Sequence, residues 1–279
     1  MIKGKRILIT GFAGSVGQEL VYQLSKHNKI YGLDINEIGT LDLVEEMKQE
    51  KRWVYGRVGD IRDEKTIQDV FSDFKPQIVF HTAAYKSVNM MELSPIEAIK
   101  TNIIGTYNVL SEAKKWECLE RFVLISSDKA VNSNSIMGAT KRCAEIIVKN
   151  QGKGFIVVRF GNVLGSRGSI LPIWQRQINK GQPLTITDER MERFMMTIEE
   201  SCELVIKAAE MGEGGEIFIL DMKVKVNILD FAKKIIQETR QDIPIKMIGI
   251  REGETLSEEL MTIEEKGRAI KKDKFWIIK

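Results

Sequence analysis

Short apolar runs alternate with segments of helical periodicity through the first 160 residues of this 279-residue chain. The apolar runs are predicted to be strands, because they are short, unbroken and bounded by polar or glycine residues. They are Lys5–Thr10, Ile30–Asp34, Trp53–Val58, Gln77–His81, Phe122–Ile125 and Ile156–Arg159. Helical spacing of apolar residues fills the ranges 18–27, 41–50, 64–74, 95–115 and 137–150 between them. This alternation predicts an α/β fold with a doubly wound parallel sheet.

The rhythm changes after Phe160, where a glycine-rich polar stretch covers residues 161–169. Beyond it we predict helices at 170–180, 197–211 and 228–239, and short strands at 181–187 and 217–220. The apolar ranges 243–248 and 275–278 are expected to pair in a small terminal lobe. We therefore expect a dinucleotide-binding Rossmann domain over 1–160 and a smaller α/β substrate lobe over 161–279, with some later segments returning to the first domain.

A glycine-rich turn lies between the first predicted strand and the helix after it. Gly11, Gly14 and Gly17 are spaced three residues apart there. Glycines in this context let the backbone approach a pyrophosphate, which then faces the helix N-terminus. The turn predicts a dinucleotide site that includes Ser15 and Val16. A glycine turn without a ligand is the alternative.

Further cofactor contacts are expected at the ends of the next strands. Asp34 ends the second strand, where a carboxylate accepts from the ribose hydroxyls of NAD and repels the extra phosphate of NADP. It favours NAD without excluding NADP. Asp60 and Ile61 follow the third strand and are expected at the adenine, or else Asp60 caps the next helix. Ala83 and Ala84 follow the fourth strand and leave room for the nicotinamide. His81 is interpreted as a packed strand-end histidine.

The candidate reaction centre follows the fifth strand. Ser127, Asp128 and Lys129 lie there, and Lys141 lies on the helix after them. Open α/β sheets place active sites at the carboxyl ends of their strands. Met137 precedes Lys141 by one helical turn and shares its face. A proton-transferring side chain would be useful at that position, and a thioether cannot transfer protons. The alternative for Asp128 and Lys129 is a solvated turn.

Longer motifs extend this pattern and point to a family. They are Asp60-Ile61-Arg62-Asp63, His81–Lys86, Ser126–Asn132, Met137–Arg142, Arg159–Ser169, Arg193–Thr197, Arg251–Glu254 and Glu258-Glu259-Leu260. With the glycine turn, they resemble the extended short-chain dehydrogenase/reductase superfamily. Within it they resemble the bacterial polysaccharide-biosynthesis branch, which includes the UDP-N-acetylglucosamine 4,6-dehydratases. The resemblance covers nearly the whole chain. Met137 departs from the usual Tyr, although the membrane-anchored dehydratases also carry Met there.

The resemblance implies a reaction and roles for the candidate residues. In these dehydratases sugar C4 is oxidised, C5 loses a proton, C6 loses its hydroxyl, and C6 is reduced. Asp128 and Lys129 match the acid and base of the elimination, Lys141 would hold the nicotinamide ribose, and Ser127 would contact the C4 oxygen. The product would be a UDP-4-keto-6-deoxy-N-acetylhexosamine for a bacterial surface glycan of the pseudaminic-acid type.

Met137 leaves two forms of this reaction open. In the first, the enzyme performs the full 4,6-dehydration and recruits Asp128, Lys129 or water for the C4 proton. In the second, the substrate arrives as a 4-keto-5,6-ene, and only reduction at C6 and protonation at C5 are needed. A different class, a non-enzymatic dinucleotide sensor, would also keep the glycine turn, but it need not retain Asp128, Lys129 and Lys141.

The two phosphates of a UDP-sugar call for cationic side chains. The predicted substrate-binding residues are Lys86, Asn162, Arg167, Arg193, Arg251 and Glu254. A surface ion pair is the alternative for each arginine.

Composition and charge argue against nucleic acid, a metal ion and a membrane as partners. The formal net charge of +3 provides no basic stripe for nucleic acid. Two histidines and three scattered cysteines show no metal-ligand spacing, so no metal is expected. No apolar run approaches the length of a membrane span, and the first residues lead directly into a strand, so we expect a cytoplasmic protein. A homo-oligomer is expected from the family.

Overall fold

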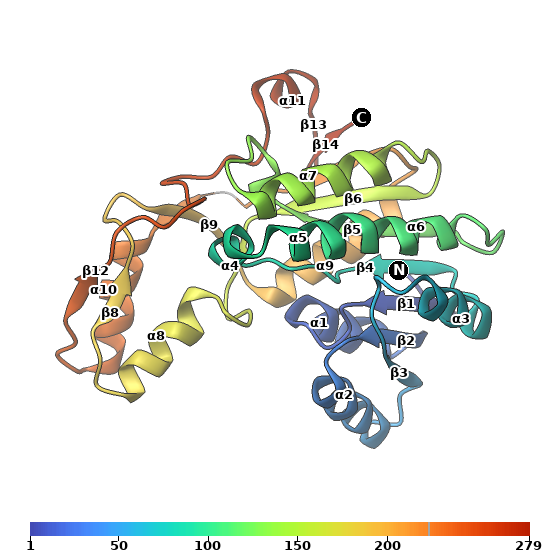
Figure 1. The fold of residues 1–279 in the computed structure, drawn as a ribbon, viewed down its shortest axis with the longest axis horizontal. Coiled ribbons are helices and arrows are strands. Elements are labelled where there is room, and N and C mark those ends of the chain that lie inside the picture. Colours follow the sequence, from blue (N-terminus) through green and yellow to red (C-terminus); the bar gives the residue numbers. More distant parts are fainter. Residues whose placement is uncertain (223) are drawn as a thin grey trace.

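The computed structural model describes residues 1–222 and 224–279. Nine strands in these ranges form one sheet in the order β13-β14-β10-β6-β5-β4-β1-β2-β3 (Figure 1). The strands from β10 to β3 in this order are parallel. They are β1 (Arg6–Thr10), β2 (Lys29–Asp34), β3 (Val54–Val58), β4 (Ile78–His81), β5 (Arg121–Ser127), β6 (Phe155–Phe160) and β10 (Ile217–Leu220). The predicted α/β fold with a doubly wound parallel sheet is confirmed.

Helices bury both faces of the sheet. α1 (Ser15–Leu24), α2 (Glu37–Gln49) and α9 (Ile198–Met211) pack on one face, and α3 (Glu64–Phe74), α6 (Thr106–Ala113) and α7 (Ile136–Lys149) on the other. The alternation of side chains along a strand divides β1 between them. Ile7 and Ile9 enter the first hydrophobic cluster, whereas Leu8 enters the second. This two-sided burial explains why the strands are continuously apolar in sequence.

The helix predicted over 95–115 is interrupted. α5 (Pro95–Ala98) begins at a proline in its first turn and runs into a π-helical segment, η1 (Ile99–Gly105), before α6. Asn102 lies in this π-helical segment with its side chain buried. A π-helical turn is often found at a functional site.

The smaller lobe lies on the left of Figure 1. It contains α8 (Ile170–Asn179), α10 (Ile228–Thr239) and the parallel pair β8 (Leu184–Ile186) and β12 (Ile245–Met247). Trp174, Leu184 and Ile228 are buried in its own hydrophobic cluster. A three-stranded sheet of β7 (Asn162–Val163), β9 (Glu192–Met196) and β11 (Lys225–Asn227) completes this half of the chain. The lobe is not one continuous stretch, because β10 belongs to the main sheet and α9 packs on that sheet.

The predicted pairing of 243–248 with 275–278 is wrong. β14 (Phe275–Ile278) instead pairs antiparallel with β10 and with β13 (Ile270–Lys272), at the edge of the main sheet. This position buries both faces of the strand, since Phe275 enters the first hydrophobic cluster and Ile278 the second. β12 pairs with β8, where Ile245 packs only against the core of the smaller lobe.

No helix in the described ranges combines the length and the apolar character needed to cross a membrane.

Candidate functional site

A cavity of about 690 Å³ opens at the carboxyl ends of the parallel strands, between the sheet and the smaller lobe. β1 and β4 are neighbours in the sheet, and the strand order reverses between them. Ligands of open α/β sheets bind at such a switch point. The cavity is lined by predicted site residues from both halves of the chain: Gly11, Gly14, Ser15, Val16, Asp34, Asp60, Ile61, Ala83, Ala84, Lys86, Ser127, Lys129, Met137, Lys141, Asn162, Arg167, Arg193, Arg251 and Glu254. Gly17 and Asp128 do not line it.

The glycine turn forms a cradle that only glycine permits. Gly11 has φ +71°, and a Cβ there would come within 2.6 Å of the Ala83 nitrogen. Gly14 is the N-cap of α1 and provides no side-chain cap, so the first amides of that helix lie open toward the cavity. Gly17 lets α1 pack closely behind the turn, because a Cβ at this position would overlap the Gly11 carbonyl oxygen. These features fit a pyrophosphate at the helix N-terminus.

Asp34 is placed to receive hydroxyl groups beside this cradle. Its Oδ2 accepts from the Ala13 N–H at 2.9 Å, and its Oδ1 accepts from the Asn36 N–H at 2.8 Å. These bonds anchor the carboxylate while leaving lone pairs for a ligand. The chemistry of this donor set fits a ribose with two free hydroxyls.

The Asp60 carboxylate is bound by Arg62 and does not cap a helix. Arg62 Nε donates to Asp60 Oδ2 at 2.7 Å, and its NH1 donates to Glu97. Burial acts to raise the pKa of Asp60, but the hydrogen bonds from Arg62 lower it below its usual range. The alternative of a helix cap is wrong, because Asp63 is the N-cap of α3.

His81 is a packed histidine, as predicted. It is 1% exposed, and its ring bonds Thr10 Oγ1 at 2.7 Å and Thr106 Oγ1 at 2.9 Å. Thr106 donates its own proton to the Asn102 carbonyl. The ring therefore donates from Nε2 and accepts at Nδ1. Burial, together with the charge of Lys141, lowers its pKa to about 3.

The residues after β5 lie in a short 3₁₀ turn, η2 (Asp128–Ala130). Lys129 Nζ faces the cavity and donates to Asp128 Oδ1 and Asn162 Oδ1, both at 3.0 Å. Asp128 was expected in the cavity, but it lies behind the wall with no exposed surface. Its Oδ1 also accepts from Ser127 Oγ at 2.8 Å. Its Oδ2 has no partner among the described residues and packs against Gly161.

Lys141 reaches from α7 to the end of β5. Its Nζ donates to the Ile125 carbonyl at 2.6 Å. Burial lowers its pKa to about 8, and the charge of Glu145 opposes that shift. Met137 is 2% exposed, and it packs with Met91 and Tyr85 in a small apolar cluster. The position one turn before Lys141 is therefore occupied by apolar packing.

Asn102 links this helix to the loop after β4. Its Oδ1 accepts from the Tyr85 N–H at 2.8 Å, and its Nδ2 donates to the Tyr85 carbonyl and to Thr140 Oγ1. The π-helical turn orients the Asn102 side chain toward Tyr85 and Thr140, next to the candidate site.

The predicted substrate-binding residues surround the outer part of the cavity. Arg167 and Arg251 are exposed at its rim. Lys86 Nζ donates to Ser166 Oγ at 3.2 Å and so connects the loop after β4 with the glycine-rich stretch. Burial and the charge of Lys129 lower the pKa of Lys86. Glu254 Oε2 accepts from the Arg251 N–H at 3.1 Å and closes the turn that carries them both.

Arg193 is 6% exposed, so the alternative prediction for this residue, a surface ion pair, is wrong. Its guanidinium donates to three backbone carbonyls, those of Glu192, Thr255 and Leu256. It thus fastens the segment around residue 256 to β9.

Glu258 is a cavity residue to which sequence reasoning assigned no role. It is 8% exposed, and its Oε1 lies 3.9 Å from Lys129 Nζ and 4.0 Å from the Arg193 NH2 group. The sequence placed it only in a late motif. No local pattern connects it with Lys129, more than a hundred residues earlier.

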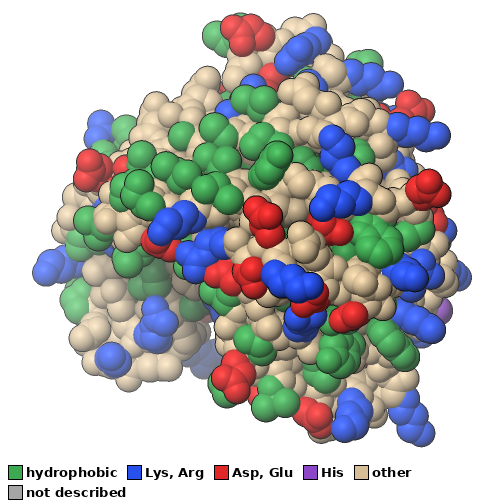
Figure 2. Space-filling model, turned by 45° about the vertical axis from the view of Figure 1, so that its right-hand side comes forward, with side chains coloured by type: hydrophobic (Ala, Val, Ile, Leu, Met, Phe, Trp, Pro, Cys, Tyr) green, Lys and Arg blue, Asp and Glu red, His purple; other side chains and the backbone are tan. Residues whose placement is uncertain are grey.

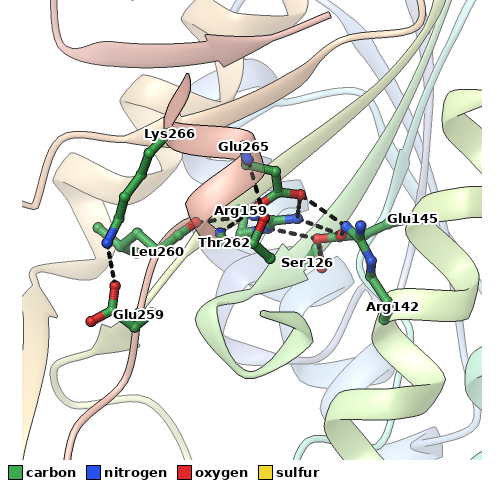
Figure 3. Close-up of polar contacts among 9 residues, drawn as sticks. All are labelled: Ser126, Arg142, Glu145, Arg159, Glu259, Leu260, Thr262, Glu265 and Lys266. Carbon is green, nitrogen blue, oxygen red and sulfur yellow. Dashed lines mark hydrogen bonds and ion pairs between the residues drawn. The ribbon is translucent and has the colours of Figure 1, made fainter. Parts of the chain in front are cut away.

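A second polar cluster lies on the other side of the β5 strand end. In Figure 3, Arg159 of β6 contacts Glu145 of α7 and Glu265 of α11 (Ile263–Arg268). All five of its N–H donors are used, for the two carboxylates and the Leu260 carbonyl. Ser126 Oγ donates to Glu145 at 2.6 Å. We call Ser126, Glu145, Arg159 and Glu265 the Arg159 cluster.

Comparison with known proteins identifies the family. A family model described as "Polysaccharide biosynthesis protein" matches residues 7–279. The chain belongs to this family. A capsular polysaccharide biosynthesis protein, CapD, of Staphylococcus aureus is 42% identical over 95% of the chain and 46% of its own length. The chain therefore spans about half the length of that relative.

Solved structures share the fold. The structure of Pen from Bacillus thuringiensis has a TM-score of 0.93 and 35% identity, over 99% of this chain and 89% of that one. A dTDP-glucose 4,6-dehydratase from Bacillus anthracis, solved with NAD, has a TM-score of 0.78 and 19% identity, over 90% and 86% of the two chains. Other relatives and neighbours are named UDP-glucose 4-epimerase. The polysaccharide-biosynthesis branch of the resemblance is confirmed, whereas the 4,6-dehydratase subfamily stays a prediction.

Proposed function

We propose that the protein is an NAD(P)-dependent enzyme that modifies a UDP-N-acetylhexosamine for a bacterial surface glycan, forming a 4-keto-6-deoxy sugar. The observation that carries the proposal is the single cavity that joins the glycine turn, the Ser127–Lys129 turn with Lys141, and the arginines of the second half. A nucleotide sugar and a dinucleotide are the two ligands that such a combination suits.

The inner half of the cavity would hold the dinucleotide. The open amides of α1 receive the pyrophosphate, and Ala83 and Ala84 leave space for the nicotinamide. Asp34, with its anchored carboxylate, favours NAD over NADP. When bound, the cofactor supplies reversible hydride transfer to and from the sugar. The names of structural neighbours, which include NAD complexes, support this assignment.

The residues of the Ser127–Lys129 turn and α7 would handle protons and charge. Lys129 faces the cavity and is the base for the C5 proton, held in place by Asp128 and Asn162. With substrate bound, Ser127 would donate to the C4 oxygen in place of its hydrogen bond to Asp128. Lys141, anchored on the Ile125 carbonyl, holds the nicotinamide ribose and adds positive charge. Arg251, with Arg167, receives the diphosphate at the rim, and Glu254 accepts from nucleoside hydroxyls.

Met137 favours the shorter of the two possible reactions. Its thioether packs against Met91 and Tyr85 and can accept no proton from a C4 hydroxyl. Reduction of a 4-keto-5,6-ene at C6 with protonation at C5 moves no proton at the C4 oxygen. Full 4,6-dehydration remains the more common reaction among the resembled enzymes. Both reactions use Lys129 at C5.

Product analysis tests the proposal. Pure protein is incubated in deuterated water with NAD or NADP and either UDP-N-acetylglucosamine or the corresponding 4-keto-5,6-ene. NMR then reports deuterium at C5, reduction at C6 and the configuration at both carbons. We expect a 4-keto-6-deoxy product from at least one substrate. A product inverted only at C4 would indicate an epimerase and overturn the proposal.

Thermal stability separates an enzyme from a dinucleotide sensor. A ligand that binds only the folded state raises the melting temperature. We expect both UDP and the dinucleotide to raise it. A shift with the dinucleotide alone would favour the sensor.

We also propose a homo-oligomer. α5, α6 and α7 expose large apolar side chains, including Ile96, Tyr107 and Ile146. Figure 2 presents a face on which hydrophobic side chains gather among a few charged groups. An exposed apolar patch typically marks an association surface. Light scattering coupled to size exclusion should give at least twice the chain mass of 31.8 kDa.

A further inference from the structure

We propose that Tyr85 is a further catalytic residue of this site, and that its phenolic O–H donates a hydrogen bond to the C4 oxygen of the bound sugar. The assignment rests on the proposed function and deepens it. Both forms of the proposed reaction place negative charge on the C4 oxygen when C5 loses or gains its proton. They therefore share a need for hydrogen-bond donors at that oxygen.

Two residues that could serve the C4 oxygen by their position in the sequence are poor donors. Met137 stands one helical turn before Lys141, and its thioether has no proton to donate. Ser127 Oγ has a single proton, which the Asp128 carboxylate accepts at 2.8 Å. Because a carboxylate is a stronger acceptor than a neutral carbonyl, Ser127 must give up a charge-assisted bond in order to bind the sugar. A hydroxyl with no competing acceptor is the better donor.

Tyr85, in the loop after β4, provides such a hydroxyl close to Met137. It lines the cavity, and its half-buried side chain packs against the small apolar cluster that contains Met137 and Met91. The hydroxyl makes no hydrogen bond to another described residue. It is also absent from the buried oxygens without a partner in the described ranges, which belong to Thr40, Asp128, Ser169 and Thr255. The Tyr85 hydroxyl is therefore accessible and free to bind a ligand.

A chain of hydrogen bonds fixes Tyr85 relative to the helical turn that carries Met137. Asn102 binds both backbone groups of Tyr85, since its Oδ1 accepts from the N–H at 2.8 Å and its Nδ2 donates to the carbonyl at 3.0 Å. The same Nδ2 donates to Thr140 Oγ1, which in turn donates to the Met137 carbonyl at 2.8 Å. Asn102 is 1% exposed. A donor held by such a network is oriented before the substrate arrives, which is what stabilisation of a developing charge requires.

Tyr85 transfers no proton in this assignment. When the neutral amine of Lys129 takes the C5 proton of a 4-keto sugar, the C5–H electron pair forms a C4–C5 double bond and the carbonyl becomes an enolate oxygen. When a hydride reaches C6 of a 4-keto-5,6-ene, the C5–C6 double-bond pair shifts to C4–C5 and gives the same enolate. Protonation of C5 by the Lys129 ammonium restores the ketone. The O–H of Tyr85 stabilises the oxyanion more than the ketone and so lowers the barrier.

Tyr85→Phe tests this assignment, with Tyr55→Phe as the matched control. Both variants lose one phenolic oxygen and keep the ring, and Tyr55 of β3 is 53% exposed and does not line the cavity. The measured rate is exchange of the C5 proton of the UDP-4-keto-6-deoxy sugar in deuterated water, followed by NMR. This exchange passes through the enolate and needs no hydride transfer. The rise in melting temperature with UDP and with the dinucleotide is measured on the same samples.

We expect Tyr85→Phe to lower kcat for C5 exchange by about 10²–10³-fold, the usual effect of removing one donor to an oxyanion. KM should change little, because the lost interaction is made mainly in the transition state. The melting-temperature shifts with UDP and the dinucleotide should equal those of wild type. Lys129→Gln should abolish the exchange, and Tyr55→Phe should leave it unchanged.

Two results overturn the assignment and leave the proposed function intact. In the first, Tyr85→Phe exchanges the C5 proton as fast as wild type. In the second, it loses the exchange together with the melting-temperature shift for UDP or the dinucleotide, which is the sign of a structural role in the loop. A wild-type protein that neither exchanges C5 nor forms a 4-keto-6-deoxy product refutes the proposed function and the assignment with it.

Discussion

Ser126 and Ser127 are adjacent on β5, yet their side chains belong to two different polar clusters. One cluster is buried, and the other lies beside the cavity. Ser126 donates to Glu145 in the Arg159 cluster, whose members are at most 3% exposed. Ser127 donates to Asp128 beside the cavity, where Lys129 keeps 19% of its side chain exposed. The division follows from the alternation of side chains along a strand. In the β5–β6 pair, Ser126 lies opposite Arg159, and Ser127 lies opposite Phe160.

The two clusters differ in how far their hydrogen bonds are satisfied. Arg159 uses all five donors within the protein, so it has none left for a ligand. On the cavity side, Lys129 and Glu258 retain capacity that a substrate can use. A fully satisfied buried charge cluster fixes the relative position of the elements around it, whereas chemistry needs groups with free donors or acceptors.

The strongest test of the Arg159 cluster is Arg159→Met. The change leaves Glu145 and Glu265 buried without their main partner, and we expect a loss of about 3–5 kcal/mol in the free energy of unfolding. Urea denaturation measures it. Arg190→Met is the control, since Arg190 is exposed and pairs with Asp188. An equal, small loss in both variants would show that the cluster adds no stability.

The two serines allow a direct comparison. Ser127→Ala should lower turnover by about 10²-fold, as expected for loss of one donor to a developing oxyanion, and should also cost about 1–2 kcal/mol of stability, because the buried Asp128 loses a donor. Ser126→Ala should cost about 1–2 kcal/mol of stability, because Glu145 loses a buried donor, and should leave turnover unchanged. Steady-state kinetics and urea denaturation of both variants decide the matter. The reverse pattern would exchange the roles of the two clusters.

Acid should weaken the Arg159 cluster. Burial acts to raise the pKa of Glu265, but the hydrogen bonds and charge of Arg159 lower it to about 2. The pKa of Glu in the unfolded chain is about 4.3. The stability that the lowered pKa of Glu265 contributes is therefore fully present above that pH and is lost as the pH falls toward 2. Between pH 7 and pH 3, wild type should lose about 2 kcal/mol more than Glu265→Gln. Identical pH profiles would contradict this coupling.

The smallest expected effect concerns the rim of the cavity. Arg251→Ala should weaken UDP binding about tenfold, because one charge-assisted contact to phosphate is lost. Dinucleotide affinity should not change, since the glycine turn lies at the other end of the cavity. Calorimetry with each ligand measures both affinities. An equal loss for the two ligands would indicate that Arg251 is structural.

Much of the fold and part of the site could be predicted from local patterns. The range predicted for α3 agrees with the structure residue for residue, because Ile67, Val70, Phe71 and Phe74 mark one helical face. The glycine turn was predicted from its spacing and from its place between a strand and a helix, and the contacts that require glycine there are set by that strand–turn–helix connection. The pairing of β14 was missed, because its two buried faces depend on helices distant in sequence.

The sequence by itself determined the parallel sheet, the glycine cradle and the gathering of Ser127, Lys129 and Lys141 at one strand end. Those features follow from local periodicity and from the rule that parallel strands end at one edge. Only the tertiary structure decided which carboxylate faces the cavity. The 3₁₀ turn after β5 rotates Asp128 into the interior, and two buried arginines bring Glu258 beside Lys129 from the far end of the chain.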